Sequence, residues 1–206
     1  PAIASNLIAP LSSALVTALV SSYGQAAVAA FGLAGRIEAF MIVIFMALGG
    51  AVAPYVGQNF GAKRFDRLTD GFKFCARLSL FYAIFCIIVF YAFSGPLLSF
   101  FTQEPEVIRI AKLQLTYTPW GYGFLGLVAL CNGSFNAFGK PIPAMTISIS
   151  RTLLVYVPMA YFLASIFGIK GVFIGQVISN ILAAIVGVIW YKIIFRKLQS
   201  TAENTG

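Results

Sequence analysis

The sequence has 206 residues, of which 60% are hydrophobic and only 10% are charged, and its mean hydropathy is +0.91. Soluble globular domains contain about 45–50% apolar and about 25% charged residues, so this composition excludes an ordinary soluble domain. The chain contains no histidine, which excludes catalytic triads, zinc sites and proton switches that depend on this side chain.

Six apolar segments follow one another along the chain, and each has about the 20 residues that a helix needs to cross a membrane. Their approximate ranges are residues 2–22, 33–56, 74–93, 113–138, 143–167 and 172–194. We therefore predict an all-α, polytopic membrane protein with six transmembrane helices in residues 1–197, followed by a polar tail at residues 198–206.

The region between the third and fourth spans is predicted from local signals. The third span is expected to stop at the turn-like sequence Ser94-Gly95-Pro96. Residues 100–112 are too short and too charged to span, and Pro105 suits the first turn of a helix. A narrow apolar face follows, which predicts an amphipathic helix at the membrane interface.

The sequence carries 14 Lys and Arg residues against 6 acidic residues, a formal net charge of +8. Such a charge can indicate nucleic-acid binding, but here the charges separate apolar segments and no basic stripe with interleaved aromatic residues is present.

Cytoplasmic loops carry the excess of Lys and Arg in membrane proteins. Six alternating spans place nine basic residues on one side and four on the other: Lys63, Arg64, Arg67, Lys73, Arg77, Lys140, Lys192, Arg196 and Lys197 against Arg36, Arg109, Lys112 and Lys170. This asymmetry predicts that both termini are cytoplasmic and that the lipid bilayer, rather than nucleic acid, is the partner of the basic residues.

Small residues recur at every fourth position in two spans, and such ridges allow helix backbones to approach closely in lipid. They are Gly49, Ala53, Gly57 and Gly61 in the second span, and Gly171, Gly175, Ser179, Ala183 and Gly187 in the sixth. Four prolines lie inside spans, where each removes a backbone hydrogen bond and bends the helix: Pro10, Pro54, Pro119 and Pro158. Together these patterns predict a packed bundle with bent helices.

Polar side chains inside the spans are the candidate functional residues, because an unpaired polar group at membrane depth is costly. They are Asn6, the pair Asn132 and Asn136, the residue Arg151, and the pair Gln176 and Asn180. Each pair lies on one helix face, where it either lines a substrate cleft or makes hydrogen bonds between helices. Arg151 is expected to bond to backbone carbonyls or to extend toward the cytoplasmic surface.

Glu38 is the only carboxylate in or beside a span. A carboxylate there can bind a cation or a proton, or it can lie at the outer interface. No sequence pattern of a hydrolase, a zinc protease or a nucleotide-binding loop is present. We therefore predict that the protein is not an enzyme and has neither catalytic residues nor a metal or organic cofactor.

The sequence Val28-Ala-Ala-Phe-Gly-Leu-Ala-Gly-Arg-Ile-Glu38 is followed by Val56-Gly-Gln-Asn-Phe-Gly-Ala62 at the end of the second span. The second segment resembles the VGQNxGA signature of the multidrug and toxic compound extrusion (MATE) family, in its place before a basic loop and in its residues Gly57, Gln58, Asn59 and Gly61. Residues 98–107, 135–141 and 168–172 resemble further connecting segments of the family. The resemblance extends over about residues 1–197.

Members of this family have twelve spans in two similar lobes, and this sequence is similar to the second lobe. The resemblance implies a secondary antiporter of the prokaryotic cytoplasmic (inner) membrane, which exports cationic or amphipathic compounds in exchange for Na⁺ or H⁺. Its partner would be the N-terminal six-span lobe or a second half. In the NorM-like branch, carboxylates on the first and fourth spans of this lobe contribute to coupling, and the aligned positions here are Ala9 and Leu125. This difference favours the DinF-like branch and leaves Glu38 as the local candidate for cation coupling.

Two other functions remain open. A flippase for lipid-linked precursors, from the same superfamily, would be expected to present several cations to a pyrophosphate, whereas Arg151 is the only basic residue expected to be buried within a span. A non-transporting membrane scaffold or an unpaired half-protein would have its polar side chains facing packed neighbours, with no cavity beside them.

Overall fold

The computed structural model describes the backbone of residues 2–204 and the side chains of residues 10–202, so the side chains of Asn6 and Ala9 lie outside the described residues. The elements are α1 (Ala2–Ser21), α2 (Gln25–Gly61), α3 (Phe65–Phe101), α4 (Pro105–Tyr117), η1 (Thr118–Gly121), α5 (Tyr122–Ala137), α6 (Pro141–Ile149), η2 (Ser150–Tyr156), α7 (Val157–Phe167) and α8 (Ile169–Asn204). The segment η1 is a 3₁₀ helix and η2 is a π-helix. The all-α fold class is therefore confirmed.

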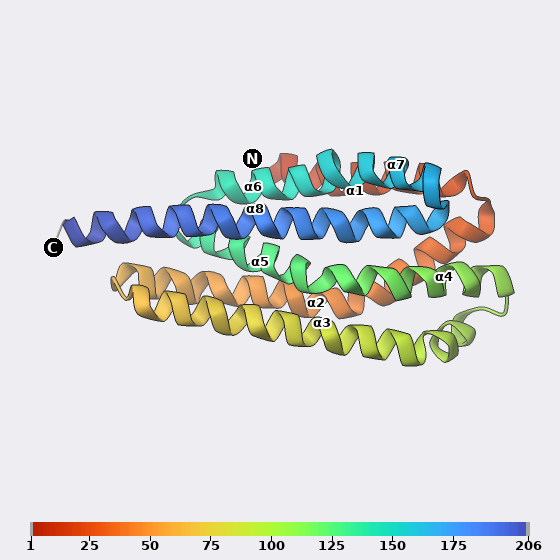
Figure 1. The fold of residues 1–206 in the computed structure, drawn as a ribbon, viewed down its shortest axis with the longest axis horizontal. Coiled ribbons are helices and arrows are strands. Elements are labelled where there is room, and N and C mark those ends of the chain that lie inside the picture. The colour runs from red at the N-terminus through yellow and green to blue at the C-terminus, as the bar shows by residue number, and fades with distance from the viewer. Residues whose placement is uncertain (1, 205–206) are drawn as a thin grey trace.

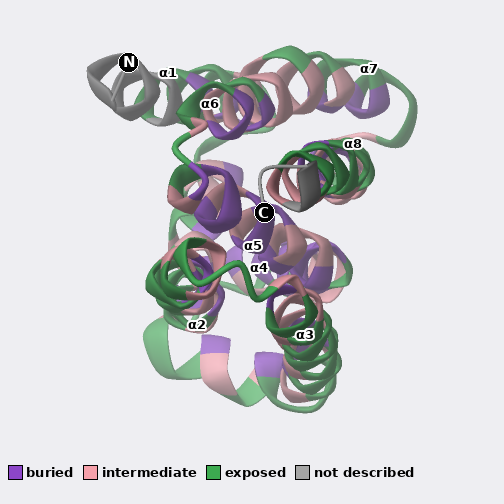
Figure 2. Ribbon diagram, turned by 90° about the vertical axis from the view of Figure 1, so that its left-hand side faces the viewer, coloured by how far each residue is buried: buried purple, intermediate pink, exposed green. Residues whose placement is uncertain are grey.

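The helices run along one long axis and form an elongated bundle (Figure 1). Helices α2 and α3 form an antiparallel pair, α4, η1 and α5 follow one line beside them, and α1, α6 and α7 form the opposite edge. Seen from the end of the bundle, α5 lies between α2 and α6 on one side and α3 and α8 on the other (Figure 2). Since α5 contacts α2, α3, α6 and α8, it is the centre of the bundle.

Four segments of the described chain are long and apolar enough to cross a membrane, namely α2, α3, Pro141–Phe167 and Ile169–Ala202. Pro10–Ser21 forms a shorter apolar helix. The fourth predicted span, residues 113–138, is carried by α4, η1 and α5, none of which has that length alone. Membrane-spanning helices are therefore confirmed for four segments, and the count of six stays a prediction.

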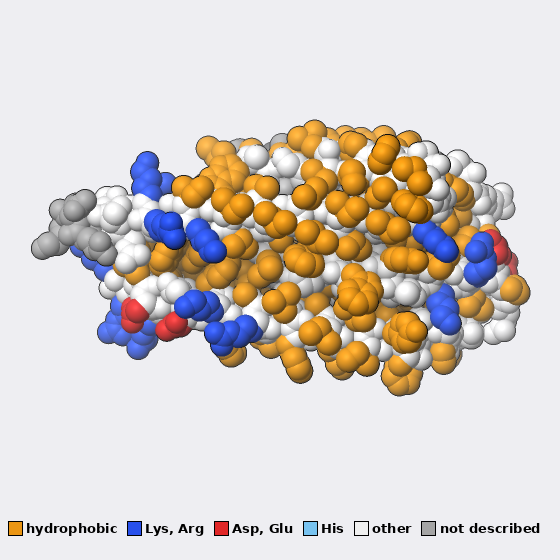
Figure 3. All heavy atoms as spheres, in the orientation of Figure 1, with side chains coloured by type: hydrophobic (Ala, Val, Ile, Leu, Met, Phe, Trp, Pro, Cys, Tyr) orange, Lys and Arg blue, Asp and Glu red, His pale blue; other side chains and the backbone are white. Residues whose placement is uncertain are grey.

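An apolar surface covers the middle of the bundle, and basic side chains gather toward its two ends (Figure 3). The α2–α3 and α5–α6 connections and the end of α8 lie at one end, whereas the α3–α4 and α7–α8 connections lie at the other (Figure 1). Lys63, Lys140 and Lys197 of the larger basic group lie at the first end, and Lys170 of the smaller group lies at the second. Which end faces the cytoplasm stays a prediction.

The third span does not stop at Ser94-Gly95-Pro96, because α3 continues to Phe101. Ser94 and Leu98 are both buried against the bundle, and their packing keeps this stretch helical despite the missing N–H of the proline. The turn predicted from these three residues is therefore wrong.

The segment predicted to lie at the membrane interface also differs in the structure. Helix α4 begins at Pro105 and extends to Tyr117, beyond the expected end at residue 112. Val107, Ile110 and Ala111 are buried in a hydrophobic core, because α4 packs against α2 and α3. Its apolar face therefore contacts protein rather than lipid. At the other end of the chain, α8 remains helical through Asn204, past the predicted start of the polar tail.

The small-residue ridge of α8 brings this helix against the backbone of α7. A Cβ atom added at Gly171 would collide with the carbonyl group of Leu163, and one added at Gly175 would lie 3.0 Å from the backbone N of Ala160. At Gly187 the nearest atoms would be 3.6 Å away, at ordinary contact distance. The closest approach therefore lies at the start of α8.

The ridge of α2 is used only in part. A Cβ at Gly49 would lie 3.0 Å from the Cβ of Ala129 in α5, whereas one at Gly57 or Gly61 would meet nothing within 4 Å among the described residues. In the last turn of α2 the contact is made by large side chains instead, because the ring of Phe60 lies against that of Phe138, directly after α5, with 5.2 Å between their centroids. The continuous ridge predicted over Gly57 and Gly61 is therefore wrong.

Replacing Gly171 with Ala should lower the thermal midpoint of the purified protein in detergent, because the added methyl group forces α7 and α8 apart. Overpacking of this kind costs about 1–3 kcal/mol. The matched control is Gly32→Ala in α2, where a Cβ meets nothing within 4 Å and the greater helix propensity of Ala is favourable. An equal midpoint for the two variants would contradict the close approach of α7 and α8.

Candidate functional site

Glu38 lies in the interior of the bundle, with 4% of its surface exposed. Its Oε1 atom is 2.5 Å from the hydroxyl oxygen of Thr118 in η1. The side chains of Gln114 in α4 and Tyr122 in α5 lie beside the same carboxylate, and Tyr156 of η2 is near enough to interact with it electrostatically. These five residues form what we name the Glu38 cluster.

Three members of the Glu38 cluster lie outside the residues predicted from the sequence. Gln114, Thr118 and Tyr122 follow one another at intervals of four along α4, η1 and α5, which places them on one helix face. All three are buried, with at most 2% of their surface exposed. A polar side chain at every fourth position is the sequence pattern that could have identified these three residues. Pro119 interrupts this pattern and makes a continuous helix less evident.

Two oxygen atoms of the Glu38 cluster are buried without a hydrogen-bond partner among the described residues, namely Oε1 of Gln114 and the hydroxyl of Tyr122. Buried polar atoms are bonded in the great majority of cases, to protein, water or a bound ion. Hard cations take oxygen ligands of these types. The Glu38 cluster can therefore hold a small cation, or a proton on its carboxyl group.

No basic side chain within the described residues forms an ion pair with Glu38. Another glutamate, Glu106, does form an ion pair, with Arg109 at 2.6 Å, at the exposed start of α4. There the hydrogen bonds from Arg109 hold the pKa of the Glu106 carboxyl below its usual value. Glu38 thus differs from Glu106 in being buried and in having only neutral neighbours.

A second polar group lines a cavity of about 340 Å³ between α2, α5 and the α6–η2 segment. Asn132, Asn136, Ser148 and Arg151 lie on its wall, and so does Leu125. The Nδ2 group of Asn132 donates to Oγ of Ser148 at 3.0 Å. The Oδ1 atom of Asn132 and the Nε group of Arg151 are buried with no partner among the described residues. Asn132 therefore both bonds to a neighbouring helix and faces the cavity.

The predicted pair on α8 has a divided role. Asn180 is buried, and its Oδ1 atom accepts a hydrogen bond from Nη1 of Arg151 at 3.0 Å. The structure thus gives Arg151 a side-chain partner where a backbone carbonyl was expected. A Cβ at Gly121 would lie 2.9 Å from Nδ2 of Asn180, so Asn180 contacts both η1 and η2. Gln176 is half-buried and does not line the cavity.

The loop motif ends α2 and shapes the turn into α3. The side-chain amide of Asn59 donates a hydrogen bond to the backbone carbonyl of Tyr55 at 2.9 Å. The backbone carbonyl of Asn59 accepts one from the backbone N–H of Arg64, also at 2.9 Å. The other motif residues, Gly57, Gln58 and Gly61, belong to the last turns of α2. The motif therefore stabilises a connection, and neither the Glu38 cluster nor the cavity includes it.

A model of the MatE family matches residues 1–162. The chain belongs to the MatE family. Two curated relatives are each 29% identical to it: the FAD transporter of Shewanella oneidensis over 205 residues, and the probable multidrug resistance protein YoeA of Bacillus subtilis over 203 residues. These matches cover 100% and 98% of this chain but 45% and 44% of the relatives. The chain thus spans less than half the length of these MatE relatives, which are transporters rather than enzymes.

Solved structures show the same fold. The Vibrio cholerae MATE transporter VcmN in its bent form matches with a TM-score of 0.91 and 35% identity, over 96% of this chain and 45% of that chain. A MOP superfamily transporter from Pyrococcus furiosus is 21% identical and matches with a TM-score of 0.88, over 95% of this chain and 44% of that chain. The described helices therefore have the arrangement of one lobe of a MATE transporter.

Replacing Thr118 with Val should lower the thermal midpoint more than replacing Thr116 with Val. Each substitution removes a hydrogen bond to a backbone carbonyl four residues earlier, at 2.9 Å for Thr118 and 2.7 Å for Thr116. Only Thr118 also contacts Glu38, and a buried polar group that is left without its hydrogen-bond partner costs about 1–3 kcal/mol. Equal midpoints for the two variants would contradict the contact.

Proposed function

We propose that this chain is the second six-span lobe of a twelve-span secondary antiporter in the cytoplasmic membrane of a prokaryote, with both termini cytoplasmic. Its partner is the N-terminal lobe or a second half. The proposal is supported by the MatE family match and by the coverage of about 45% of the VcmN chain. Leu125 lines the cavity where a NorM-like relative would have a carboxylate, which supports the DinF-like branch.

The observation that carries the coupling role is the burial of Glu38 among neutral oxygen-bearing side chains. An isolated carboxylate at this depth is costly in its charged form. Binding of Na⁺ or H⁺ removes that cost, and release restores it. The coupling ion therefore changes the energy of the surrounding helices when it binds, as alternating access requires.

Of the two ions, the geometry of Thr118 favours the proton. Its hydroxyl oxygen lies 2.5 Å from Oε1 of Glu38 and 2.9 Å from the carbonyl oxygen of Gln114. A hydroxyl group has one proton to donate and can accept another hydrogen bond. When Thr118 donates to the carbonyl, its contact with Glu38 is satisfied by a proton on the carboxyl group.

The exported compound is proposed to be cationic or amphipathic, bound in a cleft to which the cavity of this lobe contributes. Asn132 and Asn136 line that cavity, whereas a scaffold would have these residues against packed neighbours. Among the described residues, Arg151 is the only charged side chain that lines this cavity, so the cavity lacks the several cations expected of a flippase for pyrophosphate-linked lipids. Both observations favour the antiporter over the two alternatives.

Replacing Glu38 with Gln in the full-length protein should lower ion-driven efflux of ethidium from cells by about tenfold or more, a change of about 1.4 kcal/mol in activation free energy. The amide has a similar shape but does not exchange a proton. Efflux is measured under imposed Na⁺ and H⁺ gradients separately, which identifies the coupling ion. The control is Glu106→Gln, which removes an exposed carboxylate. Wild-type efflux by Glu38→Gln under both gradients would overturn the coupling role.

A second candidate substrate is an anionic compound such as a flavin dinucleotide. It is favoured by Arg151, whose Nε group is buried at the cavity and has no partner among the described residues. The similarity to the FAD transporter of Shewanella oneidensis covers the whole of this chain and supports the same choice. A phosphate oxygen in the cavity would accept a hydrogen bond from the Nε–H group of Arg151.

Replacing Arg151 with Gln should lower FAD transport into proteoliposomes by about tenfold or more if the substrate is anionic, since a charged hydrogen bond contributes about 1.5–3 kcal/mol. Lys170→Gln, at an exposed position at the start of α8, is the charge-matched control. Absence of FAD transport by the wild-type protein, with ethidium transported, would exclude this candidate and retain the cationic one.

A further inference from the structure

A basic groove lies between α3 and α8. These two helices lie on the opposite side of α5 from α2 and α6 (Figure 2), which line the polar cavity. The volume of the groove is about 450 Å³. Lys73 and Arg77 of α3 and Lys192 and Arg196 of α8 line it, and no acidic side chain of the described part of the chain does. Four positive charges around one groove attract an anion, and no group in the proposed transport mechanism uses them.

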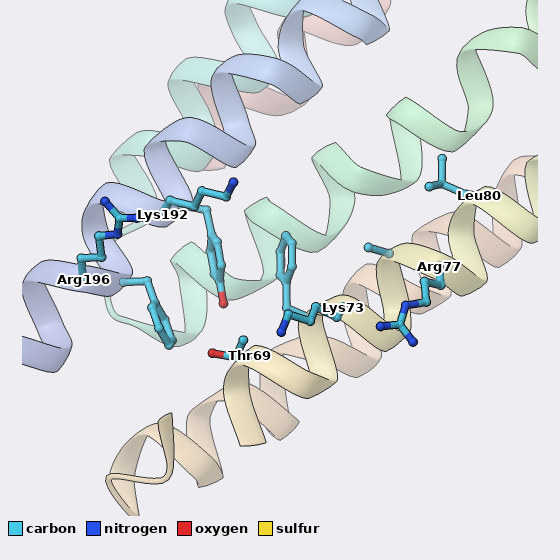
Figure 4. Close-up of a pocket in the computed structure, with 10 residues that line it drawn as sticks. Thr69, Lys73, Arg77, Leu80, Lys192 and Arg196 are labelled. Atoms are coloured by element: carbon cyan, nitrogen blue, oxygen red, sulfur yellow. The ribbon is translucent and has the colours of Figure 1, made fainter. Parts of the chain in front are cut away.

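The basic side chains lie along the two edges of the groove, with Lys192 and Arg196 extending from α8 and Lys73 and Arg77 from α3 (Figure 4). Its inner wall is aromatic, because the rings of Phe72 and Tyr191 stack with their centroids 4.2 Å apart. The groove therefore offers charge at its edges and flat apolar surface between them.

Tyr191 gives a second observation that points to a ligand. Its side chain lines the groove and has 6% of its surface exposed. Its hydroxyl is buried with no hydrogen-bond partner among the described residues. Since buried hydroxyl groups are nearly always bonded, an oxygen atom of a bound molecule would satisfy it.

Apolar residues continue from the groove along both helices toward the middle of the bundle. Leu80 lines the groove on α3, and Ile84 follows one turn later with 56% of its surface exposed. On α8, Ile189 precedes Lys192 and is 53% exposed. Exposed apolar side chains of this kind cover the middle of the bundle (Figure 3). The groove thus joins a charged end of the bundle to exposed apolar residues of the same two helices.

We propose that this groove binds an anionic phospholipid, with its phosphate among the four basic side chains and its acyl chains over Leu80 and Ile84. A small soluble anion would neutralise the charges but leave the adjoining apolar surface uncovered. A zwitterionic lipid has the same acyl chains but no net negative charge to match the edges. The basic side chains thus require the anionic phosphate, and the adjoining apolar side chains require the acyl chains.

The test uses the full-length protein in neutral detergent, with phosphatidylglycerol and phosphatidylcholine of identical acyl chains at equal concentrations. Native mass spectrometry measures how many molecules of each lipid remain bound. Wild-type protein should prefer phosphatidylglycerol, and the double variant Lys73→Gln, Lys192→Gln should lose about 30-fold in that preference. The size follows from a contribution of about 1 kcal/mol for each basic residue near an anionic lipid surface.

The matched control is Lys63→Gln with Lys197→Gln, which removes the same charge from exposed positions outside the groove. It should keep the wild-type preference, and so should the charge-retaining variant Lys73→Arg, Lys192→Arg. An equal loss in the control would overturn the proposal in favour of general attraction by the basic end. Displacement of the lipid by millimolar inorganic phosphate would overturn it in favour of a soluble anion. Equal binding of the two lipids by wild-type protein would overturn it whether or not the variants fold.

Discussion

The positions of the Glu38 cluster and of the polar cavity depend on how closely α5 approaches its neighbours. A Cβ at Gly133 would collide with the carbonyl oxygen of Gly49 in α2, and one at Gly126 would collide with the hydroxyl of Ser79 in α3. In lipid, helices gain little from the hydrophobic effect when they associate, so contact between backbones and small residues holds them together. Because α5 continues from η1, these contacts also fix where Thr118 meets Glu38.

The two irregular helical segments have a shared neighbour in α8. Segment η1 follows from Pro119, which lacks the N–H that an α-helix would use, and η2 is a π-helix that ends just before Pro158. Asn180 contacts Gly121 in η1 and bonds to Arg151 in η2. A backbone that departs from α-helix geometry inside the membrane needs protein partners for its polar groups, and this asparagine supplies contacts to both segments.

The same contacts connect the Glu38 cluster to the polar cavity. Thr118 belongs to η1 and contacts Glu38, while Gly121, at the end of the same short helix, contacts Asn180. Asn180 in turn bonds to Arg151, which lines the cavity. The two groups are chemically distinct, since one consists of oxygen atoms around a carboxylate and the other includes an unpaired guanidinium N–H. If the proposed coupling ion binds at Glu38, a change in η1 would therefore act directly on a contact of the polar cavity.

The sequence by itself determined the fold class and the family, because composition, apolar segment length and one specific loop motif are local properties of the chain. It also singled out Glu38 as a candidate, because a carboxylate in an apolar segment is visible without the fold. It also separated the basic residues into the two groups that the ends of the bundle carry.

The tertiary structure alone decided which polar residues surround Glu38, because Thr118 is 80 residues away along the chain and its contact depends on packing at glycines of α5. It likewise decided that α3 continues through Pro96, because the burial of Leu98 outweighs a local turn signal. The tertiary structure also decided the basic groove, since Lys73 and Lys192 come together only when α3 and α8 lie on one side of α5.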